Sequence, residues 1–415
     1  MRQILHVDCN NFYASVECLY HPEIRNYPVV VAGDAANRHS VIMAKNLIAK
    51  KLGIQTGDVV WQARARVPNL VVMSPDYPKY IKYSRRCREI YREYTEQVEP
   101  FGLDECWLDL TGSLPMLKKD AVAVAEEIRR RVKYELGITV SIGVSYNKIF
   151  AKLGSDLKKP DAVTVIPKEN FKEIVWNLPV SDLLYVGDRT ASKLELIAVN
   201  TIGDLARLDI EIARRKFGKM GEILWAFANG YDSTPVRKVG EEAVIKSIGN
   251  GITCHRDLEN EQDVKLVFQI LAESVASRLR ESGMKCKGVQ IMLRGNDLSG
   301  FVRQHKVRLP MNTSEPLVDE AMDLLRRNWR WQRRLRSISL SGIYLVSADT
   351  EMQLSLFDDK AEKLLVQENL EKAVDWIRWR FGHGYIKRCS SMLDAKLTNF
   401  NPRDYDLIHP YSYFR

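Results

Sequence analysis

Short apolar runs alternate with amphipathic stretches along the first 145 residues of the chain. The apolar runs predict strands over residues 3–7, 29–32, 101–110 and 139–144. The amphipathic stretches predict helices over residues 11–20, 42–52, 81–97 and 121–136. Strands and helices interleaved in this way predict an α/β or α+β first domain.

The pattern changes twice in the rest of the chain. Between about 170 and 235 the strand signals vanish, and glycines interrupt short helical stretches. Alternation then returns, which predicts a small α+β domain with strands near 289–294, 301–309 and 338–346 and helices near 263–282 and 315–328. A helix over about 360–381 and a polar, aromatic tail follow. A length of 415 residues allows two to four domains.

Charge and cysteine content narrow the class of protein. The chain carries 62 Lys and Arg against 53 Asp and Glu, and residues 237–346 alone hold 19 against 13. This excess indicates a polyanion partner and places much of the basic surface in the later α+β domain. No apolar run approaches the ~20 residues that a membrane helix needs, and Asp8 interrupts the position of a signal peptide. The seven scattered cysteines include no CxxC pair, so we expect a cytoplasmic protein with reduced thiols and no membrane contact.

Three carboxylates fall at the ends of predicted strands. Asp8 ends the first strand, and Asp104 and Glu105 follow a Pro-Phe-Gly turn at 100–102. Neighbouring strand residues point to opposite faces, so both reach one site only if that turn distorts the backbone. Clustered carboxylates suit Mg²⁺ ions that clamp the oxygens of a phosphoryl transfer. The alternative is structural: Asp8 would cap the next helix, and the acidic pair would serve the turn.

Several segments resemble Y-family DNA polymerases, the translesion group that contains the polymerase IV and UmuC-like enzymes. HVDCNNFYASVE (6–17) and FGLDECWLDLT (101–111) resemble the two palm motifs of the family. The third core motif, the thumb and the start of the little finger are matched, in order, by segments at 144–162, 178–206 and 246–253. The resemblance implies an α+β multidomain right-hand polymerase with an antiparallel-rich palm.

By the same resemblance, the domains are a palm (1–10 and 75–168), fingers (11–74), a thumb with a helix-hairpin-helix (169–236), a little finger (237–346) and a C-terminal tail (347–415). It further implies that Asp8 and Asp104 bridge two Mg²⁺ ions, for which Mn²⁺ can substitute, and that Glu105 binds the catalytic ion. The backbone carbonyl of Cys9 would complete the metal site.

The resemblance also implies how an incoming deoxynucleoside triphosphate is held. Phe12 and Tyr13 would lie at its sugar, with Tyr13 as the steric gate against a ribose hydroxyl. Without the motif, Tyr13 would be interpreted as an aromatic residue of the core rather than as a steric gate. Lys50 and Lys159 would contact the triphosphate.

The sequence departs from the usual family pattern at four positions. Leu47 and Lys50 stand where polymerase IV enzymes usually carry Tyr and Arg, and a Lys lacks the bidentate fork of Arg. UmuC-like members also have a Lys at that position. Gly102 replaces a Ser beside the acidic pair, and Tyr185 begins a loop in which Gly-x-Gly is common. These departures concern the grip on the triphosphate and the subgroup, because none of them removes a proposed metal ligand.

Two segments are candidates for template–primer binding. Residues 183–196 read as a helix-hairpin-helix in which Gly187 would offer a backbone N–H to a DNA phosphate, or as a plain helical hairpin. The segment RRNWRWQRRLR (326–336) holds six arginines and reads as the basic end of a helix. It is either a solvated surface or a contact to duplex phosphates, with Arg333, Arg334 and Arg336 as the candidates.

The peptide QLSLF (353–357) resembles the motif that docks bacterial polymerases on their sliding clamp. Its anchors would be Gln353, Leu354, Leu356 and Phe357, and the motif suggests a bacterial source. An isolated pentapeptide of this kind is otherwise usually a packing element.

We therefore expect a low-fidelity, template-directed DNA polymerase without a proofreading segment, working as a monomer on primer–template DNA. A non-catalytic scaffold for DNA and clamp, a UmuC-like subunit that needs partners, and a nucleotidyl cyclase are the alternatives. Intact carboxylates argue against the scaffold, and a cyclase needs no thumb, little finger or clamp peptide.

Overall fold

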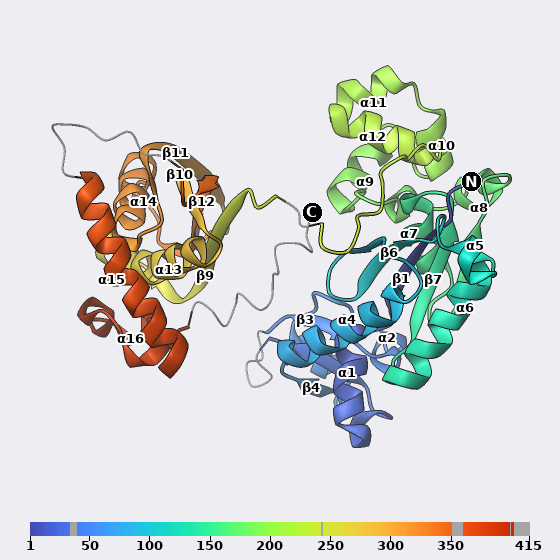
Figure 1. The fold of residues 1–415 in the computed structure, drawn as a ribbon, viewed down its shortest axis with the longest axis horizontal. Coiled ribbons are helices and arrows are strands. Elements are labelled where there is room, and N and C mark those ends of the chain that lie inside the picture. Colours follow the sequence, from blue (N-terminus) through green and yellow to red (C-terminus); the bar gives the residue numbers. More distant parts are fainter. Residues whose placement is uncertain (34–39, 242–243, 351–359, 399, 402–415) are drawn as a thin grey trace. The chain divides into compact units, whose positions relative to one another are not determined.

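The computed structural model describes residues 1–33, 40–241, 244–350, 360–398 and 400–401 (Figure 1). Within this part the chain forms two compact units that meet in sequence near residue 242. Each unit contains sheets and helices around a buried apolar core of its own. The chain is therefore an α+β protein of more than one domain, as the sequence predicts.

A five-stranded sheet in the order β5–β6–β1–β7–β8 forms the centre of the first unit. Its strands are β1 (Ile4–Cys9), β5 (Val98–Pro100), β6 (Glu105–Asp109), β7 (Val140–Ser145) and β8 (Val163–Ile166). All neighbours pair antiparallel except β7 and β8, which are parallel. Every residue of β1 is buried, including the polar His6 and Asp8. Polar groups at the centre of a sheet require partners, and those partners define the candidate site below.

Helix α7 (Lys148–Leu157) packs on β1, β7 and β8, and α6 (Ala121–Arg131) packs on β7 and β8. Helix α7 lies unusually close to β7 at Gly143, where an added Cβ atom would lie 1.9 Å from the carbonyl oxygen of Ala151. A larger residue at 143 would displace α7. The close packing brings the next residue of α7, Lys152, to the edge of the site.

A smaller sheet, in the order β3–β2–β4, forms a second layer in the same unit. Its elements are β2 (Val29–Ala32), β3 (Ile42–Lys45) and β4 (Val71–Met73), with α1 (Phe12–Tyr20), α2 (Leu47–Lys51), α3 (Val60–Arg66) and α4 (Tyr77–Arg92). The single helix predicted over 42–52 is wrong, because β3 pairs with β2 before α2 begins. Asn46 separates the two elements: its side-chain oxygen accepts a hydrogen bond from the Ala49 N–H at 2.9 Å, which is an N-cap.

Short helices make up residues 171–228, and none of the described residues there forms a strand, as predicted. They are α8 (Phe171–Val175), α9 (Asp188–Glu195), α10 (Ile202–Arg207), α11 (Ile210–Phe217) and α12 (Lys219–Ala228). Short turns complete the unit at η1 (Pro22–Ile24), α5 (Leu114–Leu117), η2 (Val132–Leu136) and η3 (Val180–Asp182).

The second unit has an antiparallel sheet in the order β11–β10–β12–β9. Its elements are β9 (Ser247–Leu258), β10 (Met284–Gly295), β11 (Gly300–Met311) and β12 (Leu335–Ser347), with α13 (Glu261–Glu281) and α14 (Ser314–Asn328). Strand β9 was not predicted from the sequence. Most of its positions are half-buried or exposed, and it includes two glycines, Gly249 and Gly251, at which an added Cβ would collide with β12.

The C-terminal segment belongs to the second unit. It contains α15 (Lys360–Phe381), η4 (His383–Tyr385), η5 (Cys389–Met392) and α16 (Ala395–Thr398), and α15 has the bounds that the sequence predicts. Both α15 and α16 pack on α13. Among the described residues, no helix combines the length and apolar character that a membrane crossing requires.

Candidate active site

One cavity of the first unit gathers the three carboxylates. Asp8, Asp104 and Glu105 line it together with Cys9, Asn11, Phe12, Tyr13, Met43, Ala44, Lys45, Lys50, Thr56 and Lys159. Asp8 and Glu105 are direct neighbours across the pairing of β1 with β6. Segments separated by about a hundred residues thus meet because β1 and β6 pair antiparallel.

The backbone before β6 is distorted in the way that a shared site requires. Gly102 has a φ of 90°, a conformation that residues with a side chain rarely adopt. Asp104 lies outside the strand, which begins at Glu105, and its carbonyl oxygen accepts a hydrogen bond from the Cys9 N–H at 3.0 Å. Strict alternation therefore does not apply to Asp104, and both acidic side chains reach the cavity. In this chain Gly102 supplies that backbone conformation.

Burial, and to a smaller extent mutual repulsion, favours the neutral form of two of the three carboxylates. Burial raises the pKa of Asp104 to about 7, and the charges of Glu105 and Asp8 add to the effect. Burial also raises the pKa of Asp8, although Lys159 opposes this with an ammonium 2.7 Å from the carboxylate. Asp8 does not cap the following helix, because α1 begins at Phe12 and its N-cap residue is Asn11, with no side-chain cap hydrogen bond. The structural alternative for Asp8 is therefore wrong.

Glu105 is held by two residues that sequence reasoning missed. The Nε2 atom of fully buried His6 lies 3.0 Å from a Glu105 oxygen, and Lys152 forms an ion pair with the same oxygen. Burial alone would favour the protonated acid, but His6 and Lys152 outweigh it and hold the pKa of Glu105 at about 2. The signal was present in the sequence: His6 stands two residues before Asp8, on the same face of β1.

The donor chemistry of this site fits a divalent cation. Asp8, Asp104 and Glu105 offer the carboxylate oxygens that Mg²⁺ prefers. Burial is the main reason for the raised pKa of Asp104, and a cation among the three carboxylates would offset the smaller contribution from the charges of Glu105 and Asp8. In the described part of the chain, no three acidic, imidazole or thiol side chains are already gathered at metal-ligand spacing. Asp8 instead contacts Lys159 and Glu105 contacts Lys152, so lysine ammoniums supply the compensating charge.

Tyr13 lies at the cavity with its ring packed on other aromatic residues. Its ring stacks on Tyr80 with centroids 4.3 Å apart and planes 14° from parallel, and Tyr77 meets it edge-on. Burial and the nearby Asp104 raise the pKa of the Tyr13 hydroxyl, so the ring stays neutral. Phe12 is buried beside both rings. Tyr13 is thus both a packed aromatic and a wall of the site.

Two lysines from β3 and α2 line the same cavity. Lys50 is the predicted triphosphate contact, whereas Lys45 was not singled out from the sequence. The ammonium of Lys45 donates to the Thr56 hydroxyl at 3.0 Å, and its pKa is lowered by burial and by the charge of Lys50. Among the described residues, no carboxylate forms an ion pair with either lysine. This pair of cations suits a polyanionic ligand.

Gly187 is the residue before the first turn of α9. The element ahead of it is only the 3₁₀ turn η3, so the hairpin lacks a full first helix. Tyr185 has a φ of 71°, the left-handed conformation that the usual glycine adopts without strain.

The helix predicted near 315–328 is confirmed, and only the first two arginines of 326–336 lie in it. Helix α14 ends at Asn328, so Arg333 and Arg334 lie in the loop that follows, and Arg336 lies in β12. The loop forms because Trp329, the next residue, has an extended backbone and a buried side chain. Arg333 contacts Asp297 at 2.7 Å and Arg334 contacts Glu259 at 3.2 Å, while all three arginines are exposed.

The clamp-peptide residues 353–357 lie outside the described part of the chain.

Comparisons with known proteins identify the family of the chain. The model of the impB/mucB/samB family matches residues 7–156, and that of its C-terminal domain matches residues 245–356. A DNA polymerase IV of Acetivibrio thermocellus is 49% identical over 398 residues, covering 95% of this chain and 99% of that protein. DNA polymerase IV 1 of Bacillus subtilis is 35% identical over 409 residues, covering 96% of each chain.

Solved structures share the fold. A chimera of the Y-family DNA polymerases Dbh and Dpo4 superposes with a TM-score of 0.73 at 21% identity, covering 83% of this chain and 99% of the chimera. A binary complex of Dbh DNA polymerase gives a TM-score of 0.60 at 20% identity, with the same coverage. The fold and the near-complete alignment with polymerase IV sequences lead to one conclusion. The chain belongs to the DNA polymerase IV family of Y-family translesion polymerases and is a DNA-directed DNA polymerase.

Proposed function

We propose that Asp8, Asp104 and Glu105 are the catalytic carboxylates of this polymerase and that they hold two Mg²⁺ ions, with the Cys9 carbonyl as a further ligand. The observation that carries the proposal is the convergence of the three carboxylates on one cavity. When bound, the ions supply charge neutralisation for the attacking and leaving oxygens of nucleotidyl transfer. His6 and Lys152 keep Glu105 oriented and ionised.

The incoming deoxynucleotide would lie between the carboxylates and the expected fingers, residues 11–74. Tyr13, held by its stack on Tyr80, would exclude a ribose hydroxyl from the cavity, and buried Phe12 supports the same wall. Lys50 and Lys159 would bind the triphosphate. Lys159 contacts Asp8 at 2.7 Å and would exchange that contact for phosphate oxygens when substrate and cations arrive.

Primer–template DNA is the partner that this chemistry requires. We assign the Gly187 turn and the exposed Arg333, Arg334 and Arg336 to its phosphates, and their exposure in the described structure supports this. The peptide 353–357 would dock on the sliding clamp through Gln353, Leu354, Leu356 and Phe357, which rests on its sequence alone. All seven cysteines are unpaired, which supports a cytoplasmic location.

Cation binding at the three carboxylates tests the proposal. Thermal unfolding of the parent chain should shift upward with Mg²⁺, because a ligand that binds only the folded state stabilises it. Asp104→Asn should remove most of that shift, whereas Asp120→Asn, at the exposed cap of α6, should leave it intact. Equal shifts in all three proteins would place the cations elsewhere and contradict the proposal.

Clamp docking is tested separately. Deleting residues 353–357 should abolish stimulation of synthesis by a bacterial sliding clamp and leave distributive synthesis unchanged. Unaltered stimulation would contradict the docking role.

A further inference from the structure

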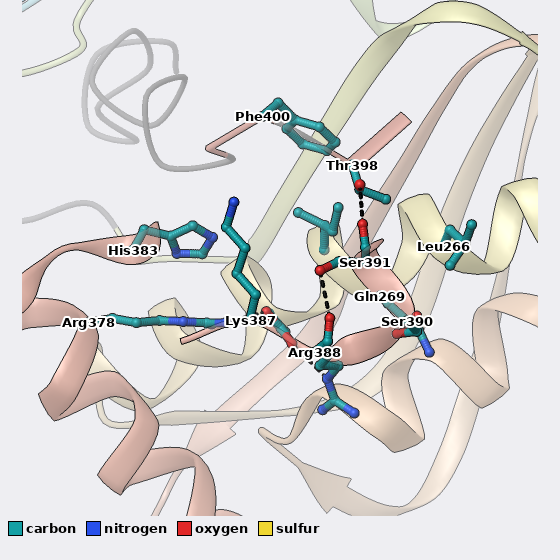
Figure 2. Close-up of a pocket in the computed structure, with 12 residues that line it drawn as sticks. Leu266, Gln269, Arg378, His383, Lys387, Arg388, Ser390, Ser391, Thr398 and Phe400 are labelled. Atoms are coloured by element: carbon teal, nitrogen blue, oxygen red, sulfur yellow. Dashed lines mark hydrogen bonds and ion pairs between the residues drawn. The ribbon is translucent and has the colours of Figure 1, made fainter. Parts of the chain in front are cut away.

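The C-terminal segment after residue 360 is fixed to the second unit by ion pairs, some of them largely buried. Arg280 of α13 contacts Glu371 and Asp375 of α15, each at 2.6 Å. Glu273 of α13 contacts Arg378 at 2.8 Å and Arg388 at 2.7 Å. Figure 2 shows the crevice at this seam, where Ser391 links Arg388 to Thr398 through hydrogen bonds. The end of α15 and the turn after it therefore have a defined place on this unit.

A continuous row of aromatic and cationic side chains lies at the end of α15. The guanidinium of Arg380 lies 5.4 Å from the ring centroid of Trp376 and 5.3 Å from that of Phe381. The ring of Phe381 in turn lies 6.1 Å from that of Tyr385. We call Trp376, Arg380, Phe381 and Tyr385 the aromatic row.

The aromatic row is exposed to an extent that its packing does not explain. Trp376 is 53% exposed, Phe381 50% and Tyr385 78%, and the neighbouring Trp379 is 83% exposed. Large aromatic side chains normally bury most of their area, and grouped exposed apolar residues mark binding surfaces. The fold of the second unit does not need these rings outside its core, since the ion pairs already attach α15.

The charge around the aromatic row is positive. Residues 376–388 contain four Lys and Arg and no Asp or Glu. Glu273 pairs with both Arg378 and Arg388 and offsets one of their two positive charges. Arg380 and Lys387 have no ion pair with any described residue, and both are exposed. Lys387 lines the crevice of Figure 2 beside His383. Free cations therefore flank the exposed rings.

We propose that the aromatic row binds single-stranded DNA, with bases stacked on Trp376, Phe381 and Tyr385 and phosphates contacted by Arg380 and Lys387. Stacking platforms with interspersed cations are the general means of binding single strands without sequence preference. Duplex DNA cannot use the rings, because its bases are already stacked on one another. A protein partner would need acidic groups for the free cations as well as an apolar surface for the rings of the aromatic row. Single-stranded template is available to any template-directed polymerase, and the proposal does not depend on which residues catalyse the reaction.

The test measures the affinity of the full-length chain for fluorescein-labelled oligo(dT) by fluorescence anisotropy, with excess unlabelled blunt duplex present throughout. Trp376→Leu/Tyr385→Leu should weaken binding about tenfold or more, because each stacked base contributes about 1–3 kcal/mol. Arg380→Gln should weaken it less and reduce its salt dependence. Met392→Ala/Leu393→Ala removes equally exposed apolar side chains from the same segment and should change nothing.

Extension of a primer–template with a short overhang should be unchanged in all variants and serves as the control for folding. Oligo(dT) affinity within twofold of the parent in the Trp376→Leu/Tyr385→Leu variant would overturn the proposal and leave a protein as the occupant of the row. An equal loss in the Met392→Ala/Leu393→Ala control would also overturn it.

Discussion

The ring of Tyr13 lies nearly flat on the ring of Tyr80, with centroids 4.3 Å apart and an angle of 14° between the planes. Tyr80 is fully buried, and its hydroxyl donates to Glu17 at 2.6 Å. The ring of Tyr13, which would face the sugar, is therefore held in place by Tyr80 of α4, a residue that does not line the cavity. Sugar selection should depend on this support as well as on Tyr13.

Replacing Tyr80 should relax the discrimination against ribonucleotides. Tyr13→Ala should admit them outright, and Tyr80→Leu should raise their incorporation about two- to tenfold, because an aromatic pair contributes about 0.5–1.5 kcal/mol. Tyr80→Phe keeps the ring and should behave like the parent. The measurement is the ratio of kcat/KM for a deoxynucleotide to that for its ribonucleotide. Unchanged ratios in both Tyr80→Leu and Tyr13→Ala would remove this stack from sugar selection.

Lys45 should contribute to binding of the incoming triphosphate. Lys45→Met should raise KM for deoxynucleotides about tenfold, because a hydrogen bond to a charged group contributes about 1.5–3 kcal/mol. Lys45→Arg should preserve most of the affinity. Lys51→Met is the matched control, since Lys51 is an exposed neighbour in α2 that does not line the cavity. If Lys45→Met and Lys51→Met have the same small effect, Lys45 is a solvated lysine.

The stability of the second unit should depend on pH through the ion pair between Arg256 and Asp263. This guanidinium contacts both oxygens of Asp263, at 2.8 and 2.9 Å, and Asp394 of the C-terminal segment at 2.7 Å. Arg256 thereby lowers the pKa of Asp263 below its ordinary value. A lowered carboxyl pKa stabilises the fold above the unfolded pKa, and this stabilisation disappears as the pH falls through the folded value.

Arg256→Gln should therefore reduce the free energy of unfolding by about 1 kcal/mol at neutral pH, the upper end for a partly exposed pair. The difference from the parent should shrink below about pH 4, where unfolded Asp begins to protonate. Urea unfolding at several pH values measures it, with Arg330→Gln as a control, because exposed Arg330 has no ion pair among the described residues. A difference that is constant with pH would contradict the account.

The sequence predicted the elements that have a simple period and missed those set by distant contacts. Helix α15 and strand β2 have the predicted bounds because each has an uninterrupted pattern. The 42–52 segment failed because pairing of β3 with β2 overrides its helical pattern, and Asn46 as a cap was the overlooked signal. The helix near 315–328 was placed correctly, but the basic stretch 326–336 was read as its end because composition does not reveal that Trp329 turns the chain into the core.

The site shows the same division. The motifs located Asp8, Asp104 and Glu105, and the turn at Gly102 gave the distortion that brings the acidic pair together. Lys152, Tyr80 and Lys45 could not be ranked from the sequence, since their importance comes from contacts that α7, α4 and β3 make in the fold. His6 could have been found, because it shares a face of β1 with Asp8. The sequence shows the aromatic residues of this row, but only the structure shows that they are exposed and do not belong to a core.

Primer extension by the purified chain tests the central claim most directly. The reaction contains Mg²⁺, deoxynucleotides and an undamaged or a damaged template, and the parent is compared with Asp104→Asn. We predict that the parent extends both primers without added subunits, and that Asp104→Asn binds primer–template equally well but does not extend it. Extension by Asp104→Asn at a rate near that of the parent would contradict the assignment of the carboxylates. Tight DNA binding by the parent without extension, in Mg²⁺ or Mn²⁺, would show that these carboxylates alone do not carry out the reaction.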